Sequence, residues 1–225
     1  MVFVLKESSY FIINMSFWRA NNIVSRTLKY YDYFVNEINC KYIWRCESKN
    51  IINMYRKNCE PSHLEIGPGT GRFLLLSERE FKRLDIMDVN EKILDYSANQ
   101  LGSQNNISVH HHNIFASDNF DLIKPSSIGV NYVLHCVPDK LENNIETLIT
   151  NLHNDGKTTM FGATVINDSE KQTVSSKLLL KFLNKQGIFH NKEDYSYNLK
   201  DYLVKNNINH ELQIIGNVLL FKLKI

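Results

Sequence analysis

The chain alternates between short, continuous apolar runs and segments in which apolar residues recur every three or four positions. The short runs around residues 63–66, 83–90, 107–114, 127–134 and 157–164 have the length of a buried β-strand. Between two of these runs, three- and four-residue spacings predict an amphipathic helix over about 139–151, with Leu141, Ile145, Leu148, Ile149 and Leu152 on one face. The alternation predicts a doubly wound α/β fold with a mostly parallel sheet.

The two ends of the chain depart from this alternation. Helical sequence rich in aromatic residues occupies about residues 17–59, ahead of the first strand. Towards the other end, the pattern predicts helices from about 172 to 206, one of which stops near Gly187. Residues 210–215 and 218–225 then predict an antiparallel hairpin.

Residues 63–72 form the most specific pattern, because an apolar strand leads there into three glycines at alternate positions. Gly67, Gly69 and Gly71 lack Cβ atoms, so the backbone can take φ > 0 and approach a ligand closely. The segment after them can start a helix whose free N–H groups face the same place. The spacing is neither that of a dinucleotide fingerprint nor that of a phosphate loop, which argues against an NTPase.

Glu65 lies in the same strand, two positions before the first glycine. A carboxylate there would repel a pyrophosphate and attract an ammonium or sulfonium group. An apolar strand, an acidic residue and then G-x-G-x-G resembles the first motif of class I S-adenosylmethionine-dependent methyltransferases. The alternative is a tight strand-to-helix turn with no ligand, which would explain one or two glycines but not the whole pattern.

The resemblance extends beyond this motif and covers about residues 26–223. Its subgroup is similar to small bacterial type 12 methyltransferases, including YbcY-like proteins, on the strength of residues 30–32, 43–46, 131–136 and 161–164. It implies a seven-stranded, Rossmann-like sheet with a C-terminal antiparallel hairpin. It also implies S-adenosyl-L-methionine as cofactor and methyl transfer to an O or N nucleophile, or an S nucleophile, of a small molecule such as a secondary metabolite.

Asp88 tests this interpretation independently. A nucleoside-binding α/β fold places an acidic residue at the end of the second strand, about 20 residues after the glycines, to bind ribose hydroxyls. Asp88 occupies that position with Val89 beside it, while Asn90 suits the cap of the next helix. Near the end of the third strand, Asn113 stands where the family often has an acidic residue beside adenine, and Ile114 would contact the ring.

The exit of the fourth strand should face the same cleft, because ligands bind outside the carboxyl ends of parallel strands. Asn131 and Tyr132 are expected there as cofactor contacts. Leu134-His135 matches a Leu-His pair that lies near the transferable methyl in similar enzymes, so His135 is a candidate catalytic base and substrate-pocket residue. The alternative is a buried histidine hydrogen-bonded to the backbone.

The aromatic residues ahead of the first strand are candidates for covering the site. Tyr31-Asp32 resembles a Tyr-Asp pair in the N-terminal caps of related enzymes, which makes Tyr31 a candidate cofactor contact. Tyr30 and Trp44 are expected to reach the substrate pocket, and most other aromatics there to pack in the core. The run at 184–191 is a further candidate for lining that pocket.

Composition narrows the partners. A net charge of +2 without a long basic run argues against a nucleic-acid substrate. Four cysteines without C-x-x-C spacing suggest free thiols in a reducing compartment, and no segment has the length of a membrane helix, so a cytoplasmic protein is expected. The three histidines at 110–112 alternate in direction along a strand, so no metal site is expected.

Without a linker or repeat, we expect a single methyltransferase domain over 1–225. About 1–59 would be a helical N-terminal lid and about 60–225 the cofactor-binding core, in a monomer or homodimer. The Asn/Asp-Pro-Pro-Tyr motif of amide-nitrogen methyltransferases is absent. A protein or RNA methyltransferase is therefore the second hypothesis, and a nucleotide-binding Rossmann protein without methyltransferase activity is the third.

Overall fold

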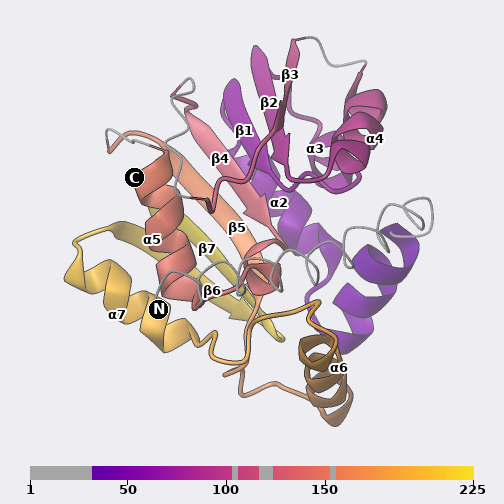
Figure 1. The fold of residues 1–225 in the computed structure, drawn as a ribbon, viewed down its shortest axis with the longest axis vertical. Coiled ribbons are helices and arrows are strands. Elements are labelled where there is room, and N and C mark those ends of the chain that lie inside the picture. Colours follow the sequence, from indigo (N-terminus) through magenta and orange to yellow (C-terminus); the bar gives the residue numbers. More distant parts are fainter. Residues whose placement is uncertain (1–31, 103–105, 117–123, 153–155) are drawn as a thin grey trace, which may run out of the picture.

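The computed structural model describes residues 32–102, 106–116, 124–152 and 156–225, and they build one seven-stranded sheet (Figure 1). The strand order is β3-β2-β1-β4-β5-β7-β6. The strands are β1 (Ser62–Ile66), β2 (Arg83–Asp88), β3 (Ile107–His111), β4 (Ser127–Asn131), β5 (Thr159–Val165), β6 (Asn209–Ile215) and β7 (Val218–Lys224). Neighbours among β1 to β5 pair in parallel, while β7 is antiparallel to both β5 and β6. The predicted doubly wound sheet with a C-terminal hairpin is confirmed.

Helices α3 (Arg72–Ser77), α4 (Glu91–Leu101) and α5 (Leu141–Asn151), the last preceded by the short 3₁₀-helix η2 (Leu134–Cys136), connect parallel strands, as the alternating pattern predicts. The π-helix η1 (Asp32–Ile43) and α2 (Ser48–Asn58) precede β1, and α6 (Val174–Lys185) and α7 (Ser196–Lys205) lie between β5 and β6. Asn90 caps α4, its side chain accepting from the Lys92 amide. Gly187 follows α6 at φ 66°, as expected of a glycine after a helix end.

The third strand is shorter than its apolar pattern predicts. It ends at His111 instead of residue 114. The chain turns directly afterwards, because Asn113 Oδ1 accepts from the Phe115 amide and the Asn113 carbonyl accepts from Ala116. A side-chain turn of this kind competes with the strand ladder for backbone hydrogen bonds.

Buried side chains form one cluster on each face of the sheet. The first joins alternate residues of the central strands to α5 and α7, which lie in front of the sheet in Figure 1. The second joins the intervening residues to α2, α3, α4 and α6. Covering both faces explains why the central parallel strands are buried along nearly their whole length.

Helix α2 falls within the predicted N-terminal lid and packs in this core. Its residues Ile51, Met54 and Tyr55 are at most 8% exposed and pack in the second cluster. Its spacing of apolar residues puts them on one helical face, and that face covers the sheet. A lid over about residues 1–59 remains a prediction.

Candidate cofactor and substrate site

The glycine loop joins β1 to α3 and takes the conformation that the sequence predicts. Gly67, Gly69 and Gly71 have φ values of 67°, 58° and 75°. A Cβ on Gly67 would overlap the Val133 side chain, whereas a Cβ on Gly69 would meet no atom within 4 Å. The open space at Gly69 is where a ligand can lie against the backbone.

A hollow of about 70 Å³ opens beside this loop. Five residues predicted from the sequence to bind the cofactor line it: Glu65, Gly67, Gly69, Asn131 and Tyr132. Five others complete the wall, namely Tyr55, Pro68, Thr70, Arg72 and Phe73. The exit of β4 therefore meets the glycine loop, as expected for the carboxyl edge of a parallel sheet.

Glu65 lies in a buried polar cluster on the face of the sheet that α2 covers. Tyr55 donates its hydroxyl proton to Glu65 Oε1 at 2.5 Å, and His63 Nε2 lies 3.0 Å from Glu65 Oε2. The other nitrogen of His63 lies 2.8 Å from the Ser127 hydroxyl. Gly129 makes room for the carboxylate, because a Cβ at this position would overlap Glu65 Oε2. A buried charge is thus matched by hydrogen bonds on both of its oxygens.

Asn131 continues this cluster from the end of β4. Its side-chain Nδ2 donates to the Tyr55 hydroxyl at 2.6 Å. Its Oδ1 is buried and has no hydrogen-bond partner among the residues that the structure describes. The side chain is 7% exposed and stands in the wall of the hollow. An unmatched buried acceptor at such a place points to a ligand donor.

Asp88 ends β2, the strand next to β1. Its Oδ1 accepts from the Asn90 amide at 2.9 Å. Burial raises the pKa of the Asp88 carboxyl to about 6, against the effect of the Asn90 and Val89 amides. At neutral pH the group is mostly ionised and can accept from two hydroxyls. Val89 follows it, and the Val89 carbonyl lies 3.0 Å from His111 Nε2.

The two residues expected beside adenine differ in their surroundings. Asn113 is exposed, with its Oδ1 engaged in the turn after β3. Ile114 is 2% exposed and packs in the core cluster shared with α5, so it offers little surface to an adenine ring. Their contacts with a nucleobase remain predictions.

His135 lies in η2, just beyond β4, and is 4% exposed. Its Nδ1 accepts from the Val165 amide at 3.3 Å and lies 3.3 Å from Thr164 Oγ1. An Nδ1 that accepts from an amide carries no proton, so Nε2 carries it. Burial lowers the pKa of the imidazole to about 3, which keeps the ring neutral. This geometry supports the alternative of a hydrogen-bonded buried histidine and makes Nε2 a donor.

Aromatic rings extend from His135 along the carboxyl edge. The Phe189 ring lies 4.2 Å from that of His135 and 6.1 Å from that of Trp44, centroid to centroid. Trp44 is only 4% exposed and packs in the core, and its role in a substrate pocket remains a prediction. Phe189 comes from the run at 184–191, and the neighbouring His190 amide donates to the His135 carbonyl. Tyr30 and Tyr31 lie outside the described residues.

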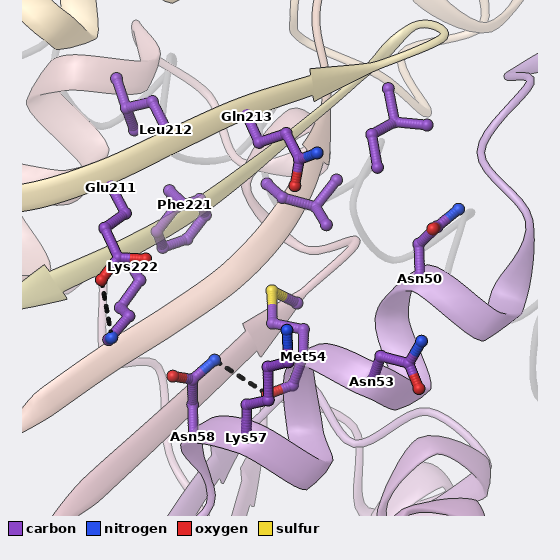
Figure 2. A pocket seen from close by; sticks show the side chains of 12 residues that line it. Asn50, Asn53, Met54, Lys57, Asn58, Glu211, Leu212, Gln213, Phe221 and Lys222 are labelled. Atoms are coloured by element: carbon purple, nitrogen blue, oxygen red, sulfur yellow. Dashed lines mark hydrogen bonds and ion pairs between the residues drawn. The ribbon is translucent and has the colours of Figure 1, made fainter.

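A second hollow, of about 620 Å³, lies between α2 and the β6–β7 hairpin (Figure 2). Its walls carry amide and charged side chains, among them Asn50, Asn53 and Gln213, and the ion pair between Lys222 and Glu211. It shares no lining residue with the hollow at the glycine loop. Positive-φ glycines and the unmatched acceptor of Asn131 meet at the smaller hollow.

In the described ranges no group of three or more histidine, cysteine or acidic side chains is arranged to hold a metal ion. His110 instead lies 2.7 Å from Asp85, and His111 lies 3.2 Å from Glu91. None of the four cysteines, all of which lie in the described residues, forms a disulfide. None of the helices that the structure describes is both long and apolar enough to cross a membrane.

Comparison with known proteins finds relatives along most of the chain, although no family model matches it. The putative uncharacterized protein YbcY of Escherichia coli K12 is 28% identical over 188 residues, 79% of this chain and 93% of the relative. Methyltransferase aurB of Calcarisporium arbuscula is 29% identical over 216 residues, 85% of this chain and 90% of the relative. Demethylluteothin O-methyltransferase of Streptomyces thioluteus is 27% identical over 185 residues, covering 79% and 78%. Another relative, vrtF of Penicillium aethiopicum, is named as an N-methyltransferase.

Solved structures share the fold at much lower sequence identity. An O-methyltransferase family protein from Burkholderia thailandensis superposes with a TM-score of 0.59 at 14% identity, over 79% of this chain. This chain spans about half of that protein, 55% of its length. The methyltransferase relatives and the structural neighbours together identify the fold of this chain as that of the class I S-adenosylmethionine-dependent methyltransferases and indicate a transferase enzyme.

Proposed function

We propose that this protein transfers a methyl group from S-adenosyl-L-methionine to an O or N nucleophile of a small molecule, with an S nucleophile as a further option. One observation carries the proposal. The buried Glu65 carboxylate, the positive-φ glycines Gly67 and Gly69, and Asn131 meet at one hollow at the carboxyl edge of the sheet. The names of the relatives, which include O- and N-methyltransferases, support the same reaction class.

The residues present suit this cofactor. The loop at Gly69 offers open backbone beside the hollow, and Asp88 supplies an ionised carboxylate for ribose. When bound, S-adenosylmethionine supplies an electrophilic methyl on a sulfonium. The chain then has to orient the acceptor in line with that methyl and to exclude water, since positioning contributes most of the acceleration.

The acceptor pocket is proposed at the rings of Tyr132, His135 and Phe189. Their centroids are 6.1 Å and 4.2 Å apart along the edge that follows β4. Aromatic walls favour a flat or apolar acceptor. His135 Nε2 can donate to an acceptor oxygen and orient it. Proton removal by His135 would require Nδ1, which the Val165 amide occupies.

The proposal also includes the setting of the enzyme. We infer a single domain in the cytoplasm, a monomer or homodimer, that acts without nucleic acid. Four cysteines without a disulfide support a reducing compartment, and the small net charge supports a partner other than nucleic acid.

Calorimetric titration of the purified protein with S-adenosylmethionine, S-adenosylhomocysteine and NAD tests the cofactor. We expect micromolar binding of the first two, weakened by Asp88→Ala, and no binding of NAD. A panel of phenols, amines and thiols with labelled cofactor then identifies the acceptor atom. Binding of NAD alone would establish a Rossmann protein of another class, and methylation of protein or RNA in preference to the panel would establish the second hypothesis.

A further inference from the structure

The orientation of the Asn131 amide is determined by a chain of hydrogen bonds that starts outside the glycine motif. Tyr55 has one hydroxyl proton, and it goes to Glu65 Oε1, because a carboxylate can only accept. The same hydroxyl oxygen must therefore accept from its second neighbour. Asn131 can donate only through Nδ2, so its Oδ1 is turned away from Tyr55.

The second carboxylate oxygen of Glu65, Oε2, also accepts a hydrogen bond, in this case from His63. Ser127 Oγ accepts from the Glu60 amide at 2.9 Å and lies 2.8 Å from His63 Nδ1. If the serine proton points to Nδ1, His63 carries its proton on Nε2 and donates to Glu65 Oε2. Every proton in this chain then points towards the Glu65 carboxylate. Burial and the Glu65 charge raise the pKa of Tyr55 well above its usual value, so Tyr55 remains a donor.

One polar atom of this chain of bonds is left without a partner in the described part of the protein, and it is Asn131 Oδ1. Asn131 is one of the residues that line the same hollow as Glu65 and Gly67. Glu65 and Arg72 both line this hollow, so its charges suit an ammonium together with its neighbouring carboxylate.

We propose that Tyr55, supported by His63 through Glu65, is a positioning residue that fixes the Asn131 amide so that Oδ1 accepts from the ammonium of the cofactor's methionyl end. This inference rests on the proposed function. It assigns a role to α2, which lies outside the glycine motif, and it predicts that the protein distinguishes ligands by their amino group.

The test compares two ligands, S-adenosylhomocysteine and its deaminated analogue, in which hydrogen replaces the amino group. The ratio of their dissociation constants isolates the ammonium contact, because both ligands carry the same adenosine. For the unmodified protein we expect a preference of at least about tenfold for S-adenosylhomocysteine, typical of a hydrogen bond to a charged group. In Tyr55→Phe the preference should fall to about threefold or less, since the amide is free to rotate.

Tyr55→Phe keeps the ring, which stacks on Phe73 and packs edge-on against Phe161. The matched control is Tyr202→Phe on α7, which removes a hydroxyl from the opposite face of the sheet and should leave the ratio unchanged. Circular dichroism and thermal unfolding verify that each variant is folded. Asn131→Leu, which removes donor and acceptor together at similar volume, is the second variant and should also abolish the preference.

The outcomes separate the two proposals. If the unmodified protein binds neither ligand, the proposed function fails. If it binds both equally, or if Tyr55→Phe and Asn131→Leu weaken both ligands by the same factor, Asn131 does not receive the ammonium and the cluster is structural only. A preference that disappears in both variants while adenosine-dependent binding persists supports the positioning role.

Discussion

The imidazole Nδ1 of His135 accepts a hydrogen bond from the backbone amide of Val165 at 3.3 Å. This contact ties the exit of β4 to the end of β5 and decides where the histidine proton resides. Because the acceptor nitrogen of this buried histidine is used, its remaining Nε2–H can only donate.

His135→Asn tests this assignment, because asparagine Oδ1 can take the place of Nδ1 and accept from Val165. We expect kcat to fall by no more than about fivefold, since loss of a general base costs roughly 10² to 10⁴-fold. The burial-lowered pKa of about 3 also predicts no rate change near pH 6.5 that depends on this residue. Rates from pH 6 to 9 measure both effects.

His210→Asn on β6 is the matched control for that substitution, because His210 lies in the hairpin and bonds only locally, near the Ile208 carbonyl. A hundredfold loss in His135→Asn, with normal cofactor binding and an unaffected control, would instead establish His135 as a catalytic base.

The glycine loop gives a second prediction, because its glycines differ in their surroundings. Both glycines have left-handed backbone, with φ values of 67° at Gly67 and 58° at Gly69. The methyl of Gly67→Ala would overlap the Val133 side chain, whereas that of Gly69→Ala would meet no atom of the described residues within 4 Å. Left-handed backbone costs an alanine about 1–2 kcal/mol. Both variants should lose about that much stability, and Gly67→Ala should lose more because the loop must also move away from Val133. Urea unfolding measures the difference.

Measuring cofactor affinity distinguishes the effect of backbone strain from the effect of a change in the site. Gly156→Ala carries the same kind of strain, at φ 79° with open space, in a loop away from the site. It should cost similar stability and leave the affinity for S-adenosylhomocysteine unchanged. Equal affinities in Gly67→Ala and Gly156→Ala would show that the loop does not contact the cofactor.

Asp88 gives a prediction about pH. Its pKa of about 6 means that the carboxyl gains a proton as the pH falls through 6 and loses its charge-assisted bonds to ribose. Binding ribose hydroxyls favours the ionised form, so affinity for S-adenosylhomocysteine should decrease by up to about tenfold per pH unit below 6. Asp88→Asn should bind more weakly at pH 8 and show no such dependence. Titrations with S-adenosylhomocysteine at pH 5, 6, 7 and 8 measure this dependence. If the affinities of the unmodified protein and Asp88→Asn changed in parallel with pH, Asp88 would not bind the ribose.

The parts of the site that are local in sequence could be predicted from it. Gly67, Gly69, Glu65 and Asn131 reach one hollow because a strand, a turn and the parallel neighbour of that strand determine where they lie. The positive φ values and the Asn90 cap are likewise properties of a few consecutive residues. The spacing of hydrophobic residues was sufficient to predict the order of strands and helices along the chain.

The rest depends on contacts between distant segments. Tyr55 and Asn131 are 76 positions apart, and His135 and Val165 are 30 apart. No local sequence pattern predicts that α2 packs against β1 and β4. From the sequence alone, Tyr55 therefore could not be distinguished from the other core aromatics. The protonation of His135 could not be inferred either, because its donor is a backbone amide with no side-chain signature.

Asp194 gives the last prediction, on stability. It is 1% exposed, and its Oδ1 accepts from the Leu141 amide in the first turn of α5. Burial raises the pKa of this carboxyl from 3.8 to about 8, and the nearby Glu142 and Asp139 charges add to the rise. Between these pH values the folded protein holds a proton on Asp194 that the unfolded chain has released, so stability falls as the pH rises from about 4 to 8.

Asp194→Asn keeps the acceptor for Leu141 without the charge. It should therefore exceed the unmodified protein in stability by more than about 1 kcal/mol at pH 8, with a smaller difference at pH 5. Urea unfolding at both pH values measures this difference, with the exposed Asp95→Asn on α4 as control. If Asp194→Asn and the unmodified protein keep a constant difference from pH 5 to 8, Asp194 does not titrate in this range.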